Sequence, residues 1–164
     1  MIVLGCDPGP DTHGLVRFDT DAQRVISTNA AATTGEVLAA IRDQHIDHVA
    51  IERFRAGGHC TADIVATIFN SGRFYQCVGE TDPPLPRSLI TRATVLSVLD
   101  CNGLDGNRDA RVRQGLYQRF GGESGSRKVA VGTKANPGPL HGVVQDAMQA
   151  LGVAVCAELL MVTP

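Results

Sequence analysis

Residues 1–14 read MIVLGCDPGPDTHG, and this stretch decides how we interpret the rest of the chain. The Ile-Val-Leu run at positions 2–4 is too short and too β-branched to begin a helix, so it predicts a buried strand that ends at Asp7. The Pro-Gly pair at 8–9 breaks that strand, and the apolar run at 15–18 predicts an antiparallel return strand. An Asp-Pro-Gly turn by itself is more often structural than functional, so the role of Asp7 depends on what the fold brings beside it.

Length and composition indicate one compact α/β domain over residues 1–164. A chain of 164 residues is long enough for an enzyme and too short for two full lobes. Aromatic residues make up 4% and Trp is absent, so Val, Ile, Leu and Ala must fill the core around a central sheet. The five cysteines form no CxxC pair, which is typical of reduced thiols. No apolar run reaches the length of about 18 residues that a membrane span needs, and no basic leader precedes the first strand. We therefore expect an unexported, cytoplasmic protein.

A second predicted strand also ends in an acid. We expect a helix over 34–44, with Thr34 as its N-cap, and the apolar run HVAIE follows it at 48–52. The right-handed crossover rule places this strand parallel to the first. Neighbouring parallel strands end at the same edge of a sheet, so Asp7 and Glu52 should lie together where α/β proteins keep their sites.

The remaining pattern completes a five-stranded mixed sheet flanked by helices. We expect two further strands, over 24–28 and 87–90. The other expected helices span 61–77, with Ile64, Val65, Ile68 and Phe69 as its buried stripe, 91–99, 108–120 and 140–160. Residues 121–139 lack periodicity and predict a mobile loop. The last helix is apolar but carries Asp146 early in it, and a charge at that place needs a reason.

Three carboxylates are therefore candidates for one site, namely Asp7, Glu52 and Asp146. If the last helix packs on the sheet near the first strand, the three converge, and clustered acids without a cation repel one another. Hard oxygen ligands favour Mg²⁺ or Mn²⁺ over zinc. Two such ions activate a water and stabilise the leaving 3′-oxygen in phosphodiester hydrolysis.

The charge distribution suggests where a polyanion would bind. The formal net charge is −2, which argues against a general nucleic-acid binder. However, residues 108–134 hold seven Lys or Arg and only two acids. This basic segment is either a solvated helix face or a phosphate-binding surface beside the acids.

Several of these motifs together resemble one family. The acid-turn motif Asp7-Pro8-Gly9, the strand VAIE at 49–52, the segment RDARVRQGL at 108–116 and the late helix DAMQALGVA at 146–154 are similar, in this order, to the RuvC family of Holliday-junction resolvases, including phage-type members. The resemblance covers most of the chain and implies a ribonuclease H-like fold.

The resemblance also implies a function. It makes Asp7, Glu52 and Asp146 the catalytic metal ligands for Mg²⁺, with Mn²⁺ as a substitute. It implies a homodimer that nicks two strands of a four-way DNA junction symmetrically. Two positions depart from the family pattern: Gln149 stands where RuvC has a fourth acid, and Leu96 stands where RuvC-like proteins carry a base.

Further side chains are candidates for accessory roles. Gln149 could hold a metal-bound water through its amide oxygen, and His141 and His13 are candidate proton shuttles or metal ligands as well as ordinary structural residues. Phe54 could stack on an unpaired base, although packing is its more common role. The candidate phosphate contacts are Arg53, Arg55, Arg92, Arg108, Arg111, Arg127, Lys128 and Lys134.

Three hypotheses follow. The first is a Mg²⁺-dependent endonuclease that resolves branched DNA. The second keeps the fold without the chemistry, as a junction-binding module or regulatory subunit, because Gln149 adds no charge. The third is a relative of the sugar-kinase and actin superfamily, which needs two lobes and a phosphate loop that this sequence lacks.

Overall fold

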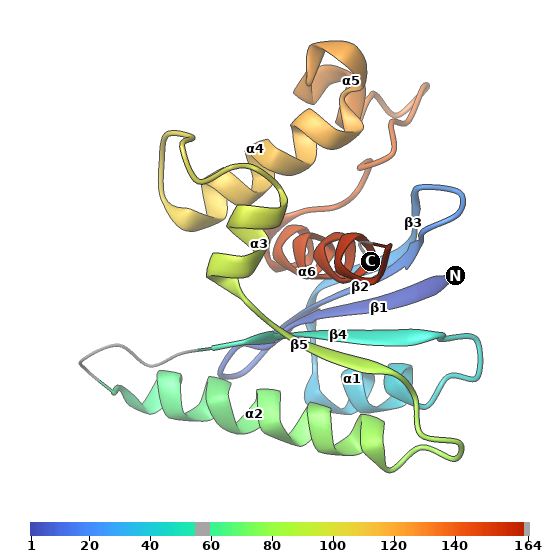
Figure 1. Cartoon of the computed structure of the whole chain (residues 1–164), viewed down its shortest axis with the longest axis vertical. Coiled ribbons are helices and arrows are strands. Elements are labelled where there is room, and N and C mark those ends of the chain that lie inside the picture. Colours follow the sequence, from blue (N-terminus) through green and yellow to red (C-terminus); the bar gives the residue numbers. More distant parts are fainter. Residues whose placement is uncertain (55–59, 163–164) are drawn as a thin grey trace.

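A computed structural model of the chain describes residues 1–54 and 60–162, and it contains the expected mixed sheet (Figure 1). The strand order is β3-β2-β1-β4-β5. Strands β1, β2 and β3 pair antiparallel, whereas β4 lies parallel to both β1 and β5. The strands are β1 Ile2–Asp7, β2 His13–Asp19, β3 Arg24–Ala32, β4 His48–Arg53 and β5 Arg87–Thr91. The α/β prediction with its crossover between β1 and β4 is confirmed.

Helices cover both faces of this sheet. The helices are α1 Thr34–Ile41, α2 Ala62–Gly79, α3 Arg92–Val98, α4 Arg108–Phe120, α5 Arg127–Val131 and α6 Gln145–Val162, with a 3₁₀ turn at Gly122–Ser124. Helices α1 and α2 lie on one face, and α6 lies on the other with α3, α4 and α5 beyond it (Figure 1). No helix within the described ranges is long and apolar enough to cross a membrane.

The two-residue period of the strands decides which side chains meet α6. In β1, Leu4 and Cys6 pack towards α1 and α2, whereas Val3 packs towards α6. Asp7 is four residues after Val3 and therefore points to the α6 face. In β4, Ala50 belongs to the core beside α6, so Glu52 points to that face as well.

Helix α6 lies in direct contact with the first two strands because glycines leave room for it. A Cβ atom on Gly5 would stand 2.2 Å from the Ala150 carbonyl oxygen. A Cβ atom on Gly14 would stand 2.1 Å from the carbonyl oxygen of Asp146. Any larger residue would push the helix away, so these glycines bring Asp146 to the edge where Asp7 ends its strand.

Several element boundaries differ from the sequence prediction. The N-cap of α1 is Thr33, not Thr34, because Thr33 forms a reciprocal capping box with Glu36, and β3 continues to Ala32. The last helix begins at Gln145 rather than at residue 140. Residues 121–139, expected to be an irregular loop, contain α5 and a short bridge between Gly132 and Pro137.

The orientation of α2 was predicted incorrectly. Its apolar stripe faces solvent, with Val65, Ile68 and Phe69 exposed by 54%, 40% and 68%. The inward face instead carries the core residues Phe74, Cys77 and Val78 together with two polar residues that have specific partners. Asn70 donates to the Gly9 carbonyl oxygen at 3.0 Å, and the Ser71 hydroxyl donates to the Glu52 carbonyl oxygen at 3.0 Å. These bonds fix the backbone around both candidate site acids, and the burial of Phe74, Cys77 and Val78 on the same face of α2 leaves the predicted stripe facing solvent.

Candidate functional site

The ends of β1 and β4 bring the first two acids together. Cys6 of β1 is paired with Ile51 of β4, so the next residues, Asp7 and Glu52, lie side by side at the end of the two strands. Glu52 is buried and Asp7 is half-buried. Burial, followed by the charge and hydrogen bonding of Glu52, raises the pKa of Asp7 to about 9 from its ordinary value of 3.8. This pair holds a proton or requires a neighbouring cation.

Helix α6 supplies the next two candidate residues. Asp146 lies in its first turn, is exposed, and adds its charge to those that raise the pKa of Asp7. Gln149 follows three residues later on the same helix face and is buried. Its amide nitrogen donates to the Asp109 carbonyl oxygen at 3.4 Å, so the amide oxygen points towards the acids. The structure thus brings together Asp7, Glu52, Asp146 and Gln149.

Arg92, the first residue of α3, occupies the centre of this cluster. Its Nε donates to Glu52 Oε1 and its Nη2 lies beside Glu52 Oε2, both at 2.8 Å. The same Nη2 is 3.7 Å from Asp7 Oδ1, and Nη1 is 3.2 Å from Asp109 Oδ1. Nη1 also donates to Gln149 Oε1. Burial lowers the pKa of Arg92, but the charges of Glu52 and Asp7 outweigh it and raise that pKa above its ordinary value.

The donor chemistry of this cluster fits a divalent cation. Carboxylate and amide oxygens are the ligands that Mg²⁺ and Mn²⁺ prefer. Glu52 Oε2 is buried and makes no hydrogen bond within the described residues, so its ion pair with Arg92 compensates its charge, and a divalent cation in place of that guanidinium would do the same. In this part of the chain, however, no three His, Cys, Asp or Glu side chains are already arranged around one metal position. Asp7, Glu52, Asp146 and Gln149 would hold the ion after a local rearrangement.

A groove of about 600 Å³ lies directly beside the acids. It is bounded by α4, α5 and the start of α6, and Asp146 and Gln149 line it. Arg113 and Arg127 line the same groove, are exposed, and have no acidic partner within the described residues. Two unpaired guanidinium groups beside an acidic cluster are suited to hold phosphates next to a reacting phosphate.

The remaining candidate DNA-contact residues differ in their exposure to solvent. Phe54 follows β4 and is 40% exposed. Arg53, Arg108, Lys128 and Lys134 are exposed, whereas Arg111 donates to the Asn102 carbonyl oxygen at 3.0 Å and has a buried Nε. Leu96 is buried in the core. Arg55 lies outside the described residues.

Neither candidate histidine lies among the acids. His141 is exposed and its Nδ1 lies 3.3 Å from the Val131 carbonyl oxygen. His13 is fully buried, and its Nδ1 accepts from the Gly9 N–H at 3.2 Å, so its Nε2 donates to Thr34 Oγ1 at 3.1 Å. His13 therefore fixes the loop that follows Asp7.

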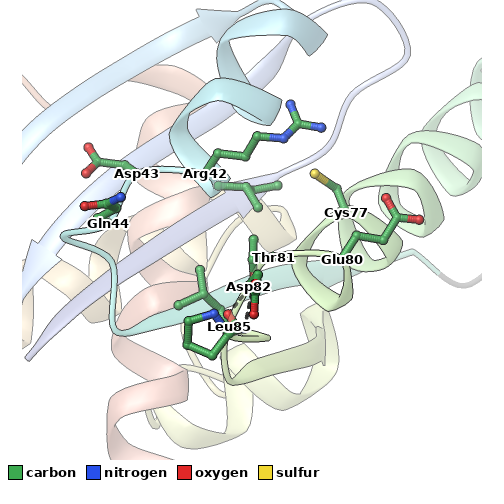
Figure 2. A pocket seen from close by; sticks show the side chains of 10 residues that line it. Arg42, Asp43, Gln44, Cys77, Glu80, Thr81, Asp82 and Leu85 are labelled. Carbon is green, nitrogen blue, oxygen red and sulfur yellow. Dashed lines mark hydrogen bonds between the residues drawn. The ribbon is translucent and has the colours of Figure 1, made fainter.

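A second cavity, of about 640 Å³, lies at the opposite edge of the sheet (Figure 2). It is formed by the C-terminal ends of α1 and α2 and by the turn before β5, and its polar side chains include Arg42, Asp43 and Glu80. The parallel strands begin at this edge and carry their acids at the other. This cavity is therefore separate from the acidic cluster.

Sequence reasoning found the acids but missed their closest neighbours. It treated Arg92 as a phosphate contact, gave Asp109 no role and left Arg113 out of the phosphate-contact set. Arg92 lies near Glu52 because β5 pairs in parallel with β4 and α3 follows β5 directly, whereas the sequence pattern predicted the strand at 87–90 without a partner strand.

The raised pKa of Asp7 predicts how the stability of the metal-free protein depends on pH. The folded state binds the Asp7 proton more tightly than the unfolded state, so stability falls as pH rises between about 4 and 9. Burial lowers the pKa of His13 and of His48, so these two residues make the stability rise with pH up to about their ordinary pKa of 6.5. The effect of Asp7 is therefore best measured above that value, at pH 7–8.5. At pH 7–8.5 in EDTA, the Asp7→Asn variant should have a higher Tm than the wild type, by about 2–4 °C for each kcal/mol gained in the free energy of unfolding.

Thermal unfolding of both proteins across this window measures the effect. The matched variant is Asp11→Asn, an exposed residue of the same loop, which should follow the wild type. An Asp7→Asn curve that declines as steeply as the wild-type curve would contradict this prediction.

The comparisons with known proteins agree with this architecture. No family model matches the chain, and a search of curated proteins finds no match either. Among solved structures, the chain is similar to Thermus thermophilus RuvC in complex with a Holliday junction substrate, with a TM-score of 0.63 and 17% identity over 98% of this chain and 94% of that one. A second T. thermophilus RuvC structure matches with a TM-score of 0.60 and 16% identity over 98% and 95% of the two chains. This chain has the RuvC form of the ribonuclease H-like fold.

Proposed function

We propose that this protein is a Mg²⁺-dependent endonuclease that cuts branched DNA, with the four-way junction as its substrate. The observation that carries the proposal is the convergence of Asp7, Glu52, Asp146 and Gln149 beside a groove with two unpaired arginines. The RuvC fold adds support, because the matched T. thermophilus protein was solved with a Holliday junction.

In the proposed nuclease, the role of each site residue follows from its position in the fold. Asp7 and Glu52 stand on paired strands, so their carboxylates are held rigidly. Asp146 lies at the boundary between the acids and the groove, where a scissile phosphate would sit. Gln149 adds an oxygen without adding charge. When bound, Mg²⁺ supplies Lewis-acid activation of water and stabilisation of the leaving 3′-oxygen.

The groove and the end of β4 would bind the DNA. Arg113 and Arg127, which lie together on the α4 and α5 side of the groove, would hold backbone phosphates next to the cleavage position. Phe54 is exposed immediately after the strand that carries Glu52. An exposed aromatic ring at that place would stack on a base that is unpaired at the branch point.

A homodimer would present two such sites to one junction. Val65, Ile68 and Phe69 form an apolar face on α2 that the rest of the described chain leaves exposed. Contiguous exposed apolar residues mark association surfaces. In a twofold-symmetric dimer, this face of α2 in one copy would pack against the same face of α2 in the second copy, so that each covers the other. We assign the dimer interface to this face of α2.

One observation favours the second candidate function. Arg92 already neutralises Glu52, and Gln149 contributes no charge for a metal. A protein that keeps this arrangement when DNA is bound would recognise junctions without cutting them.

The Asp7→Asn variant separates these two functions. With an immobile four-way junction and Mg²⁺, we expect the wild type to make paired symmetric nicks, and Asp7→Asn to lose cleavage by on the order of 10³-fold, because a metal ligand is removed. Junction binding in EDTA should persist in a gel-shift assay. Asp11→Asn should cut normally. Binding by the wild type with no nicks in Mg²⁺ or Mn²⁺ would establish the binding module instead.

The groove assignment predicts a change in the salt dependence of binding. Replacing Arg113 and Arg127 together by Gln should weaken junction binding by on the order of 10-fold and reduce the slope of log affinity against log salt by about 2. Fluorescence anisotropy with a labelled junction measures both quantities. Arg24→Gln, on the distant strand β3, is the control. An unchanged slope in the double variant would place the phosphates elsewhere.

The dimer assignment predicts that a charge on α2 produces monomers. Phe69 is 68% exposed, so Phe69→Glu should not disturb the core but should disfavour burial against a second copy. Sedimentation velocity should detect a dimer for the wild type and a monomer for Phe69→Glu. Ile26→Glu, a matched change at another exposed apolar residue, should remain dimeric. A wild-type monomer at all concentrations would contradict the assignment.

A further inference from the structure

Arg92 takes the position that a cation shared by the site acids would need. We propose that Arg92 is the resident counter-cation of this site, and that it competes with the divalent metal for Glu52 and Gln149. The inference rests on the proposed function for the identity of the metal. It adds an internal competitor that must move before the metal is bound.

Oxygen atoms of four residues surround the Arg92 guanidinium group, namely Asp7, Glu52, Asp109 and Gln149. Nε and Nη2 form a two-pronged contact with the Glu52 carboxylate, each at 2.8 Å. Nη1 contacts Asp109 and Gln149. Charge-assisted contacts at all three guanidinium nitrogens hold Arg92 in one orientation, because the planar group has its donors in fixed directions.

The same contacts exclude a metal from the carboxylates. Nη2 lies between Glu52 Oε2, at 2.8 Å, and Asp7 Oδ1, at 3.7 Å. A Mg²⁺ ion held by these carboxylates would place a second positive charge beside the guanidinium, and the two charges would repel each other at close range. The two cations therefore cannot share this position.

Gln149 is consistent with the same competition. Its amide oxygen accepts from Arg92, so the oxygen that would bind a metal or its water is already occupied. Displacing Arg92 would release Glu52 and Gln149 together. The Glu52 carboxylate and the Gln149 amide oxygen would then both be able to bind a metal ion.

Asp109 provides a second carboxylate that Arg92 could keep as its partner after leaving Glu52. It lies on α4, its side chain is 61% exposed, and it lines the groove beside Arg113. If Arg92 rotates away from Glu52 and keeps Asp109, its guanidinium enters the groove with the two unpaired arginines. A DNA phosphate there would replace the lost contact with Glu52 and favour metal binding.

The first test measures metal binding by chelator-treated protein without DNA. Mn²⁺ is titrated into wild type, Arg92→Gln and the control Arg24→Gln, and free Mn²⁺ is followed by electron paramagnetic resonance. We expect Arg92→Gln to bind Mn²⁺ more tightly than wild type by on the order of 10-fold, because the competitor is gone. Arg24→Gln should match the wild type. Equal or weaker binding by a folded Arg92→Gln would overturn the proposal.

The second test uses the wild-type protein, so it does not depend on whether Arg92→Gln folds. The Nε–H signal of Arg92 is followed by ¹⁵N nuclear magnetic resonance during a Mg²⁺ titration. We expect Mg²⁺ to shift this signal and to speed its exchange with water, because the bond to Glu52 is broken. The Arg119 side chain, paired with Glu158 at 3.2 Å, is the internal reference and should not change. An unchanged Arg92 signal under saturating Mg²⁺ would overturn the proposal.

The outcomes distinguish this proposal from the proposed function. Equal Mn²⁺ affinity in wild type and Arg92→Gln, together with junction cleavage, would overturn the competition alone. Failure of both proteins to bind Mn²⁺ would overturn the competition and the metal-dependent nuclease together.

Discussion

The need to neutralise two carboxylates buried side by side controls the rest of this site. Asp7 and Glu52 are brought together by the parallel pairing of β1 and β4, and strand periodicity turns both towards α6. Their repulsion and burial raise the pKa of Asp7, so the pair needs a proton, an arginine or a metal. In this structure, Arg92 provides the positive charge. The fold therefore creates an electrostatic demand that a catalytic metal would also satisfy.

The third acid depends on a different physical constraint, which is close backbone packing. Gly5 and Gly14 allow the start of α6 to approach β1 and β2 without intervening side chains. Asn70 and Ser71 of α2 hold the backbone near Asp7 and Glu52 from the opposite face. The acidic cluster is thus held from both sides of the sheet, so a metal bound there would displace side chains such as Arg92 rather than the backbone.

Much of this arrangement could be predicted from the sequence, because local patterns determine it. Strands that end in Asp7 and Glu52, and the extent of α4, follow from apolar runs, capping residues and the crossover rule. The orientation of α2 was predicted incorrectly because the helix offers two apolar sets. The set that packs in the core is Phe74, Cys77 and Val78, and Asn70 and Ser71 extend the same face through hydrogen bonds to distant backbone groups that the sequence does not show. The role of Arg92 was likewise hidden. Its contact with Glu52 exists only because β5 pairs with β4 and α3 follows directly.

Gln149 and Arg92 together make this site less negative than a site with four acids. In the RuvC pattern that the sequence resembles, the position of Gln149 holds a fourth acid, which strengthens the attraction for divalent ions. Here the residue at 149 is a neutral hydrogen-bond acceptor, and the arginine it accepts from also occupies Glu52. The site therefore has less negative charge and an internal cation at the same time. Under the proposed competition, both differences would weaken metal binding in the free protein, and a DNA phosphate that draws Arg92 towards Asp109 would reverse the second of them. Metal loading at this site would then depend on bound substrate more strongly than in a four-acid site without an internal arginine.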